Sequence, residues 1–281
     1  MTQAPQPRIL VFIPMYNCAG QIGRVIAQFD AATQHRFAKL IVVDNRSPDD
    51  GLQVVQAAIK TLQGIEVEVL RNRENYGLGG SHKVAFSHAI DHGFSHVVVL
   101  HGDDQGSIAD LVPLIDRGEH LTADCLLGAR FMRGSRLQGY STFRTFGNRV
   151  FNLLYSLAAG KRLFDLGSGL NLYAVAALRD KGWLSFPDDL TFNYYMILAS
   201  AAKKWRWQFF PLLWREEDQR SNVKMTRQAF KVARILLSYV FRRRHFLSAD
   251  WRARAIADYQ AETIVLQHAD VAGTSPAAVS R

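Results

Sequence analysis

Polar residues with metal-binding chemistry follow a short, wholly apolar run near residue 100. His101, Asp103 and Gln105 come directly after Val97–Leu100. The run has the length of a buried strand, and side chains two positions apart in an extended segment point the same way. Imidazole and oxygen ligands there could hold a divalent cation where an α/β sheet opens its binding crevice. The other interpretation of the stretch is an acidic turn.

Two further polar loops follow apolar runs, at Pro14–Asn17 and Asp44–Asp49. The carboxyl ends of parallel strands share one edge of a sheet, so all three loops can converge. Asp44 could then accept a hydrogen bond from a base N–H or a ribose hydroxyl. An Asp after a strand also commonly forms a turn or caps a helix, so both interpretations stay open for Asp44 and Asp103.

The elements that must position these loops alternate between strand and helix. This order predicts an α/β fold with a doubly wound, mostly parallel sheet. The expected strands are 8–13, 40–43, 67–70, 97–100, 124–128 and 205–210. The expected helices are 22–29, one ending at 60, 77–91, 144–159, 193–202 and a basic helical stretch from 224. We expect Asp165–Asn171 to be a loop.

The glycine-rich stretch Gly77–Gly80 does not have a cofactor fingerprint. His82 stands where a dinucleotide-binding motif has its third glycine, and no glycine immediately precedes Lys83 as a phosphate loop requires. We expect instead a tight turn that admits a substrate backbone closely.

The charge and the cysteines narrow the class of protein. The net charge is +9, and residues 203–254 hold 14 Lys and Arg against 4 Asp and Glu, so the basic character belongs to that segment. With two cysteines and no Cys/His cluster, we expect neither a disulfide framework nor a zinc site, which fits a reducing cytoplasm. The first residues resemble no signal peptide, and no run approaches the roughly 20 apolar residues of a membrane span.

The basic segment predicts an amphipathic helix. One face would carry the cations Lys224, Arg227, Lys231 and Arg234. Another face would carry the apolar residues Phe230, Ala233, Leu237 and Val240. Three consecutive arginines follow, at Arg242, Arg243 and Arg244. Such a helix can lie in an anionic lipid interface. The alternative is a helix docked on the catalytic domain with its charged face in water.

Seven motifs in order resemble family 2 glycosyltransferases, in particular the dolichol-phosphate mannose synthase branch, over roughly residues 8–226. The motifs are Ile13–Asn17, Val42–Asp49, Asn75–Gly80, Asp103–Gln105, Gly128–Phe131, Asp165–Gly169 and Val223–Met225. The resemblance implies a GT-A domain over 1–225, which leaves a basic amphipathic helical segment over 226–266 and a disordered tail over 267–281.

The resemblance also implies a GDP- or UDP-linked hexose donor, Mg²⁺ or Mn²⁺, inversion at the anomeric carbon and a polyprenyl phosphate acceptor. By position, the roles fall as follows: nucleotide-sugar binding on Pro14, Tyr16, Asn17, Asp44, Asn75, Gly79, Asp103 and Lys224; the metal on His101, Asp103 and Gln105; the acceptor phosphate on Arg130, Arg144 and Asn148; catalysis on Asp103, Arg130 and Asp165.

Three residues depart from the family's pattern. Cys18 stands where the family usually has Glu, Asn45 replaces the second Asp of the nucleoside loop, and His101 replaces the first Asp of the metal motif. A neutral imidazole is a good Mn²⁺ ligand and a poor Mg²⁺ ligand. The metal would therefore be Mn²⁺, or be held weakly, or be carried mainly by Asp103 and the diphosphate; Asp104 could also take the vacant position.

Three functions follow for comparison. The leading one is hexose transfer to a polyprenyl phosphate by a protein bound peripherally to the cytoplasmic face of the membrane. The second is transfer to a sugar hydroxyl, for which Asp165 would be the base or, alternatively, a loop cap. The third is a non-catalytic nucleic-acid or membrane-binding module, although the basic residues lack the aromatic and glycine pattern of an RNA-binding sheet, so no nucleic acid is expected. The sequence predicts no oligomeric state.

Overall fold

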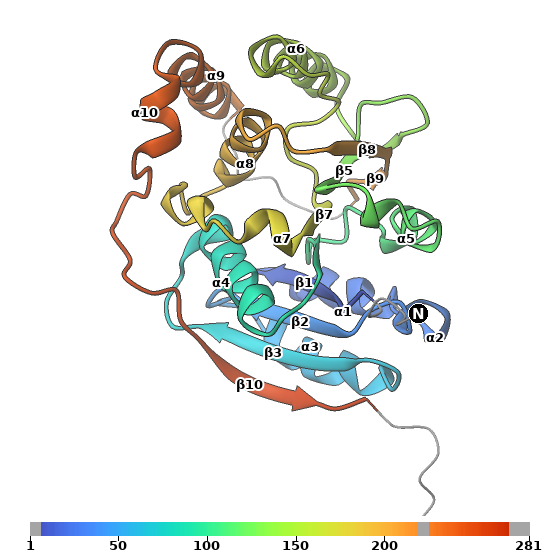
Figure 1. The fold of residues 1–281 in the computed structure, drawn as a ribbon. Coiled ribbons are helices and arrows are strands. Elements are labelled where there is room, and N and C mark those ends of the chain that lie inside the picture. The colour runs from blue at the N-terminus through green and yellow to red at the C-terminus, as the bar shows by residue number, and fades with distance from the viewer. Residues whose placement is uncertain (1–6, 218–224, 270–281) are drawn as a thin grey trace, which may run out of the picture.

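A mixed sheet of eight strands forms the centre of the computed structural model, which describes residues 7–217 and 225–269 (Figure 1). Its spatial order is β10-β3-β2-β1-β4-β7-β5-β8. The strands are β1 (Ile9–Met15), β2 (Lys39–Asp44), β3 (Glu66–Asn72), β4 (His96–Leu100), β5 (Cys125–Ala129), β7 (Leu170–Ala174), β8 (Trp207–Pro211) and β10 (Ala261–Gln267), with β6 (Arg136–Gln138) and β9 (Leu213–Arg215) paired separately.

Helices cover both faces of the sheet (Figure 1). They are α1 (Ala19–Ala27), α2 (Ala31–Gln34), α3 (Gly51–Ala58), α4 (Gly77–Asp91), α5 (Val112–Asp116), α6 (Thr142–Ala159), α7 (Val175–Leu178), α8 (Phe192–Ala202), α9 (Met225–Phe241) and α10 (Arg243–Ser248). The strands β3, β2, β1 and β4 are parallel to one another. The predicted doubly wound, mostly parallel sheet is confirmed.

Alternating side chains of the central strands enter two separate apolar layers, as the pleat requires. In β1, Leu10 and Phe12 pack with α4, α7 and α8, whereas Val11 and Ile13 pack with α1 and α3. Every residue of β1 and β4 is buried. The strands that carry the polar loops are thus held rigidly from both sides.

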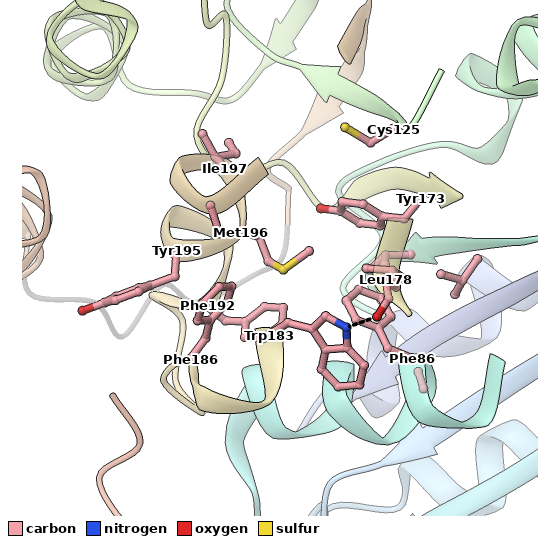
Figure 2. Packing of buried hydrophobic residues seen from close by; sticks show 14 of the residues in the cluster. Phe86, Cys125, Tyr173, Leu178, Trp183, Phe186, Phe192, Tyr195, Met196 and Ile197 are labelled. Atoms are coloured by element: carbon pink, nitrogen blue, oxygen red, sulfur yellow. Dashed lines mark hydrogen bonds between the residues drawn. The ribbon is translucent and has the colours of Figure 1, made fainter. Parts of the chain in front are cut away.

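Aromatic packing joins α4 to α7 and α8 (Figure 2). The Phe86 ring of α4 lies edge-on to Trp183, with ring centroids 5.4 Å apart. The indole N–H of Trp183 donates to the carbonyl of Leu178 (2.8 Å), so this buried polar atom is satisfied. The contact fixes the middle of α4 relative to the segment before α8.

β7 is among the strands that the sequence does not predict, because the loop expected over Asp165–Asn171 ends early. β7 begins at Leu170 and lies antiparallel between β4 and β5. Glycine and serine at 167–169 give this stretch the composition of a loop. The burial of β7 against two neighbouring strands, which a local pattern does not show, outweighs that composition.

The C-terminal segment is not helical throughout, so the helical expectation for 226–266 is wrong beyond Ser248. The chain runs back across the molecule, and β10 pairs antiparallel with β3. Of the tail expected to be disordered, 267–281, Gln267 belongs to β10, and residues from 270 lie outside the described part. In the described ranges, no helix combines the length and apolar character that a membrane crossing needs.

Candidate active site

The loops that follow β1, β2 and β4 converge around the buried thiol of Cys18. Burial, together with the smaller effects of the Asp103, Asp49 and Asp44 carboxylates, raises the pKa of this thiol to about 12. The loops after β2 and β4 therefore place carboxylates near a thiol that follows β1. The predicted convergence at the carboxyl edge of the sheet is what the structure shows.

Hydrogen bonds join these loops directly. The amide of Gly102 donates to the carbonyl of Pro14 (3.2 Å), and the amide of Asn17 donates to the Ser47 hydroxyl (3.2 Å). Pro14 is buried, whereas Asn17 is exposed and the Tyr16 side chain is 53% exposed. The Tyr16 ring is thus open for a planar partner such as a nucleobase.

Asp49 supplies a function that the sequence did not reveal. Cys18 occupies the N-cap position of α1 but caps nothing with its side chain. Oδ2 of Asp49 accepts instead from the amide of Ala19 (2.8 Å). A carboxylate from the second loop therefore satisfies the start of a helix that begins in the first.

Asp44 is completely buried at the end of β2. Its Oδ1 accepts from the amide of Ser47 (2.9 Å), which shapes the loop. Its Oδ2 lies 3.1 Å from Nε of Arg71, yet the two make no hydrogen bond because the N–H is not aligned. The structure shows Asp44 organising the loop, and its contact with a nucleoside stays a prediction.

An asparagine network positions Asn75. The side-chain oxygen of Asn45 accepts from the Asn72 side chain and from the amide of Tyr76, both at 2.8 Å. The Asn45 nitrogen donates to the Asn75 oxygen (2.8 Å). Asn45, which replaces an Asp of the family's pattern, both donates and accepts here, and a carboxylate could only accept.

Gly79 is required by the chain's own packing. A Cβ there would lie 2.4 Å from the carbonyl of Pro187 and 2.9 Å from Cβ of Phe192. The Gly79 amide donates to the carbonyl of Asp188 (2.7 Å). The backbone that approaches this glycine closely is thus that of residues 187–188, not a substrate's, and the expected substrate approach is not supported at this residue.

The His101 ring lies beneath the loop before β7. The backbone amide of His101 donates to the carbonyl of Gly169 (2.8 Å), and a Cβ on Gly169 would lie 3.0 Å from the His101 ring. Burial and the nearby Arg130 charge lower the pKa of His101 to about 4, so the ring is neutral at pH 7. Its Nε2 atom is buried and makes no hydrogen bond with any described residue.

Asp103 and Gln105 form a tight turn beside it. Oδ1 of Asp103 accepts from the Gln105 amide (3.2 Å), and burial raises the Asp103 pKa to about 6. Asp104 has a positive φ of 58° and turns away to bind Arg24, with Nε and Oδ2 2.7 Å apart. Asp104 is therefore occupied elsewhere and does not fill the place of the missing acidic ligand.

The residues of this turn fit a cation that shares its coordination with a ligand. No three His, Cys, Asp or Glu side chains gather into a metal cluster in the described ranges 7–217 and 225–269. A neutral imidazole with an unpartnered nitrogen, one carboxylate and one amide are nevertheless donors of the right kind. The diphosphate of a donor substrate would have to supply the remaining ligands.

Arg130 and Asp165 are bound to each other. Nε and Nη2 of Arg130 donate to the two carboxylate oxygens at 2.7 and 2.8 Å. The amides of Arg130 and Gly167 donate to the same carboxylate, which is 2% exposed. Burial of Arg130 disfavours its charge, but the pairing with Asp165 outweighs this effect and raises its pKa.

The three residues predicted to bind the acceptor phosphate gather around Tyr140, which the sequence did not single out. Cζ of Arg144 and of Arg130 lie 4.3 and 5.9 Å from the centre of the Tyr140 ring. The Asn148 amide donates to the Tyr140 hydroxyl (3.0 Å). Arg144 also pairs with Glu216 (2.7 Å). Lys224, predicted to meet the phosphates, lies outside the described residues.

This arrangement defines a class of protein: an α/β fold whose strand-end loops bring together a buried aspartate, an acidic turn and clustered arginines, as in GT-A glycosyltransferases. Residues 10–181 match glycosyl transferase family 2. The chain belongs to this family, and it is a glycosyltransferase.

Relatives of the chain act on lipid phosphates according to their names. The chain is 25% identical over 194 residues to undecaprenyl-phosphate mannosyltransferase of Micrococcus luteus, a match spanning 66% of this chain and 77% of that protein. It is 28% identical over 178 residues to undecaprenyl-phosphate 4-deoxy-4-formamido-L-arabinose transferase of Klebsiella pneumoniae. That match spans 62% of this chain and half of the Klebsiella protein.

A solved structure confirms the fold. Glucosyl-3-phosphoglycerate synthase of Mycobacterium tuberculosis, in complex with Mn²⁺, UDP and glucosyl-3-phosphoglycerate, superposes with a TM-score of 0.60 at 15% identity. The alignment covers 94% of this chain and 91% of that one. At this identity the likeness establishes the GT-A fold alone.

Proposed function

We propose that the protein transfers a hexose, with inversion, from a GDP- or UDP-linked donor to a polyprenyl phosphate at a membrane surface, and that it needs a divalent cation. The observation that carries the choice of acceptor is the Arg130–Asp165 pair. A hydroxyl acceptor needs a base with a free lone pair near it. Asp165 accepts four hydrogen bonds from the chain itself, three of them from Arg130 (one from its amide and two from its guanidinium), and is buried.

A phosphate acceptor suits this site because it arrives already anionic. It needs cations that hold it in line with the anomeric carbon rather than a base. The guanidinium of Arg130 uses Nε and Nη2 for its hydrogen bonds, and its Nη1 donates to none of the described residues. Nη1 is therefore available to a phosphate oxygen. We propose that Asp165 is a positioning residue that holds the Arg130 guanidinium in place.

The donor would bind across the loops after β1 and β2. Tyr16 and Asn17 are exposed there, Asn75 is held by the asparagine network, and Asp44 shapes the loop from below. Pro14 and Gly79 would contribute backbone shape. We also propose that Lys224 binds the phosphates of the donor.

His101, Asp103 and Gln105 would hold Mn²⁺ or Mg²⁺ together with the diphosphate. Bound there, the cation would offset negative charge on the leaving nucleoside diphosphate. Asp103 would be deprotonated when it binds, and the neutral imidazole of His101 favours Mn²⁺.

In the proposed reaction, one oxygen of the acceptor phosphate attacks the anomeric carbon from the face opposite the leaving group. The bond from that carbon to the β-phosphate oxygen breaks, and the nucleoside diphosphate leaves with the electron pair. No proton has to be removed from the acceptor. Arg130, Arg144 and Asn148 hold the attacking phosphate.

Transfer of label tests the proposal. The protein would be incubated with radiolabelled GDP- and UDP-hexoses, Mn²⁺ or Mg²⁺, and either undecaprenyl phosphate or soluble sugars. We expect label in the lipid fraction and its loss in Asp103→Asn. Transfer to a soluble sugar with none to the lipid would instead support a hydroxyl acceptor.

A further inference from the structure

Large apolar side chains are exposed on three neighbouring helices. Six lie on α6, four on α9 and one on α10, against five in the rest of the described residues. The eleven are Phe143, Phe146, Val150, Leu153, Leu154, Leu157, Phe230, Leu237, Val240, Phe241 and Leu247. Together they define what we call the interfacial face.

On α6 the exposed residues form one continuous stripe. Phe146, Val150, Leu153 and Leu157 follow one another at spacings of three and four, so they lie on one side of the helix. Phe146, Leu153 and Leu157 are 69%, 60% and 72% exposed. The opposite side is the buried one, with Asn152 and Tyr155. The helix therefore turns its apolar side away from the protein, the reverse of an ordinary surface helix.

The outer side of α9 continues this surface. Val232, Ile235 and Tyr239 pack into the core, which leaves Phe230 and Phe241 74% and 78% exposed. The hydroxyl of Tyr155 on α6 donates to the carbonyl of Val232 on α9 (2.9 Å). The two helices lie at the same end of the molecule, with α10 beside α9 (Figure 1).

The charged side chains on the three helices themselves are all of one sign. α6, α9 and α10 contain no Asp or Glu. Arg149, Arg234 and the run Arg242–Arg244 are exposed on or beside them. A groove of about 680 Å³ beside α6 has Leu153, Leu157 and Phe164 among its lining residues, with further cations at Lys161 and Arg162.

Apolar side chains ringed by cations match the surface of an anionic bilayer, where acyl chains lie below phosphate groups. A second copy of this chain is a poor match, since it would bring two basic faces together with no carboxylate on these helices to pair them.

We propose that the interfacial face inserts into an anionic bilayer, with the α6 stripe as its principal apolar anchor and Arg242–Arg244 on the headgroups. This extends the membrane contact expected from the C-terminal helix to an element of the catalytic domain. The membrane proposal rests on the proposed function in one respect only, namely that the protein acts at a membrane surface.

Vesicle co-sedimentation tests the proposal with the full 281-residue chain. The vesicles contain phosphatidylglycerol and phosphatidylcholine in equal amounts, or phosphatidylcholine alone, and no acceptor lipid. We expect binding to the anionic vesicles and a loss of more than about tenfold in partitioning for Phe146→Glu with Leu153→Glu. The matched control, Leu121→Glu with Leu266→Glu, places two charges at exposed apolar positions outside the three helices and should stay within about twofold of the wild type.

A second set separates charge from apolar contact. Replacing Arg242, Arg243 and Arg244 by Gln should lower partitioning by about fivefold per residue on anionic vesicles. A wild type that ignores both vesicles, or a glutamate variant that binds like the wild type, would overturn the proposal. So would a lipid-free dimer that the glutamate pair converts to a monomer. The vesicles contain no acceptor, so a failure to bind them would not contradict the proposed transfer reaction. A lack of transferase activity would likewise not contradict binding to the vesicles.

Discussion

At the scale of single residues, the site is a set of side chains held by one another before any substrate arrives. Asp165 holds Arg130, Asn45 holds Asn75, and Asp49 holds the start of α1. Such pre-organisation places donors where charge will develop and leaves little to rearrange during the reaction.

His101→Asp should raise activity with Mg²⁺ relative to Mn²⁺, because a carboxylate is a better ligand for Mg²⁺ than imidazole is. The measurement is the ratio of kcat/KM with the two metals. His101→Asn, which removes the imidazole without adding charge, is the control. An unchanged ratio in the aspartate variant would mean that His101 is not a metal ligand.

Arg130→Lys should raise the acceptor KM by about tenfold or more, because lysine cannot make the bidentate contact that keeps the cation aligned. Donor binding, followed by thermal shift with the nucleoside diphosphate, should stay unchanged. Arg133→Lys, an exposed neighbour, serves as control. An unaltered acceptor KM in Arg130→Lys would remove Arg130 from the acceptor site.

At the scale of elements, the loops depend on how closely the chain packs behind them. α4 begins at a glycine turn that the backbone of residues 187–188 presses against. The aromatic contacts of Phe86 with Trp183 and Phe192 hold the rest of that helix. A change at the turn should therefore affect folding before it affects chemistry.

Gly79→Ala should lower the free energy of unfolding by about 2 kcal/mol, because the added methyl group overlaps the Pro187 carbonyl. Urea denaturation measures the change. Gly20→Ala in α1 is the matched control, since its methyl group meets nothing within 4 Å, and a helical alanine should stabilise by up to about 1 kcal/mol. Equal stability of Gly79→Ala and the wild type would contradict the packing explanation.

The sequence predicted most elements, since apolar runs ending in polar loops give both the strand and its carboxyl end. It could not reveal β7 or β10, which depend on pairing with distant strands. It placed Arg130 and Asp165 in the site but not their mutual pairing, because 35 residues separate them along the chain. Tyr140 gave no local signal, as it acts only through the residues that gather around it.

At the scale of the whole molecule, buried histidines couple folding to pH. Burial lowers the pKa of His96 to about 4. The His96 ring lies against the ring of His120, and burial lowers the pKa of His120 as well. Below about pH 6.5 the unfolded chain takes up protons that the folded chain refuses. The stability these groups contribute is therefore complete above pH 6.5 and is lost as pH falls towards 4.

His96→Gln should reduce the slope of unfolding free energy against pH by about 1.4 kcal/mol per unit between pH 6 and 4.5, the effect of one proton. Urea denaturation at several pH values gives the slope. His35→Gln, at an exposed position, is the control. A slope in His96→Gln equal to that of the wild type would show that His96 is protonated in the folded state as well.

The pairing of β10 with β3 also has a consequence for synthesis. The outer edge of β3, residues 66–72, is covered only after residues 261–267 of β10 have been synthesised. At bacterial and eukaryotic elongation rates, that edge stays open on the nascent chain for roughly 10–40 s. An uncovered edge strand is a template for pairing with other chains. Slow translation of the stretch between residues 72 and 261 should therefore increase the demand for chaperones.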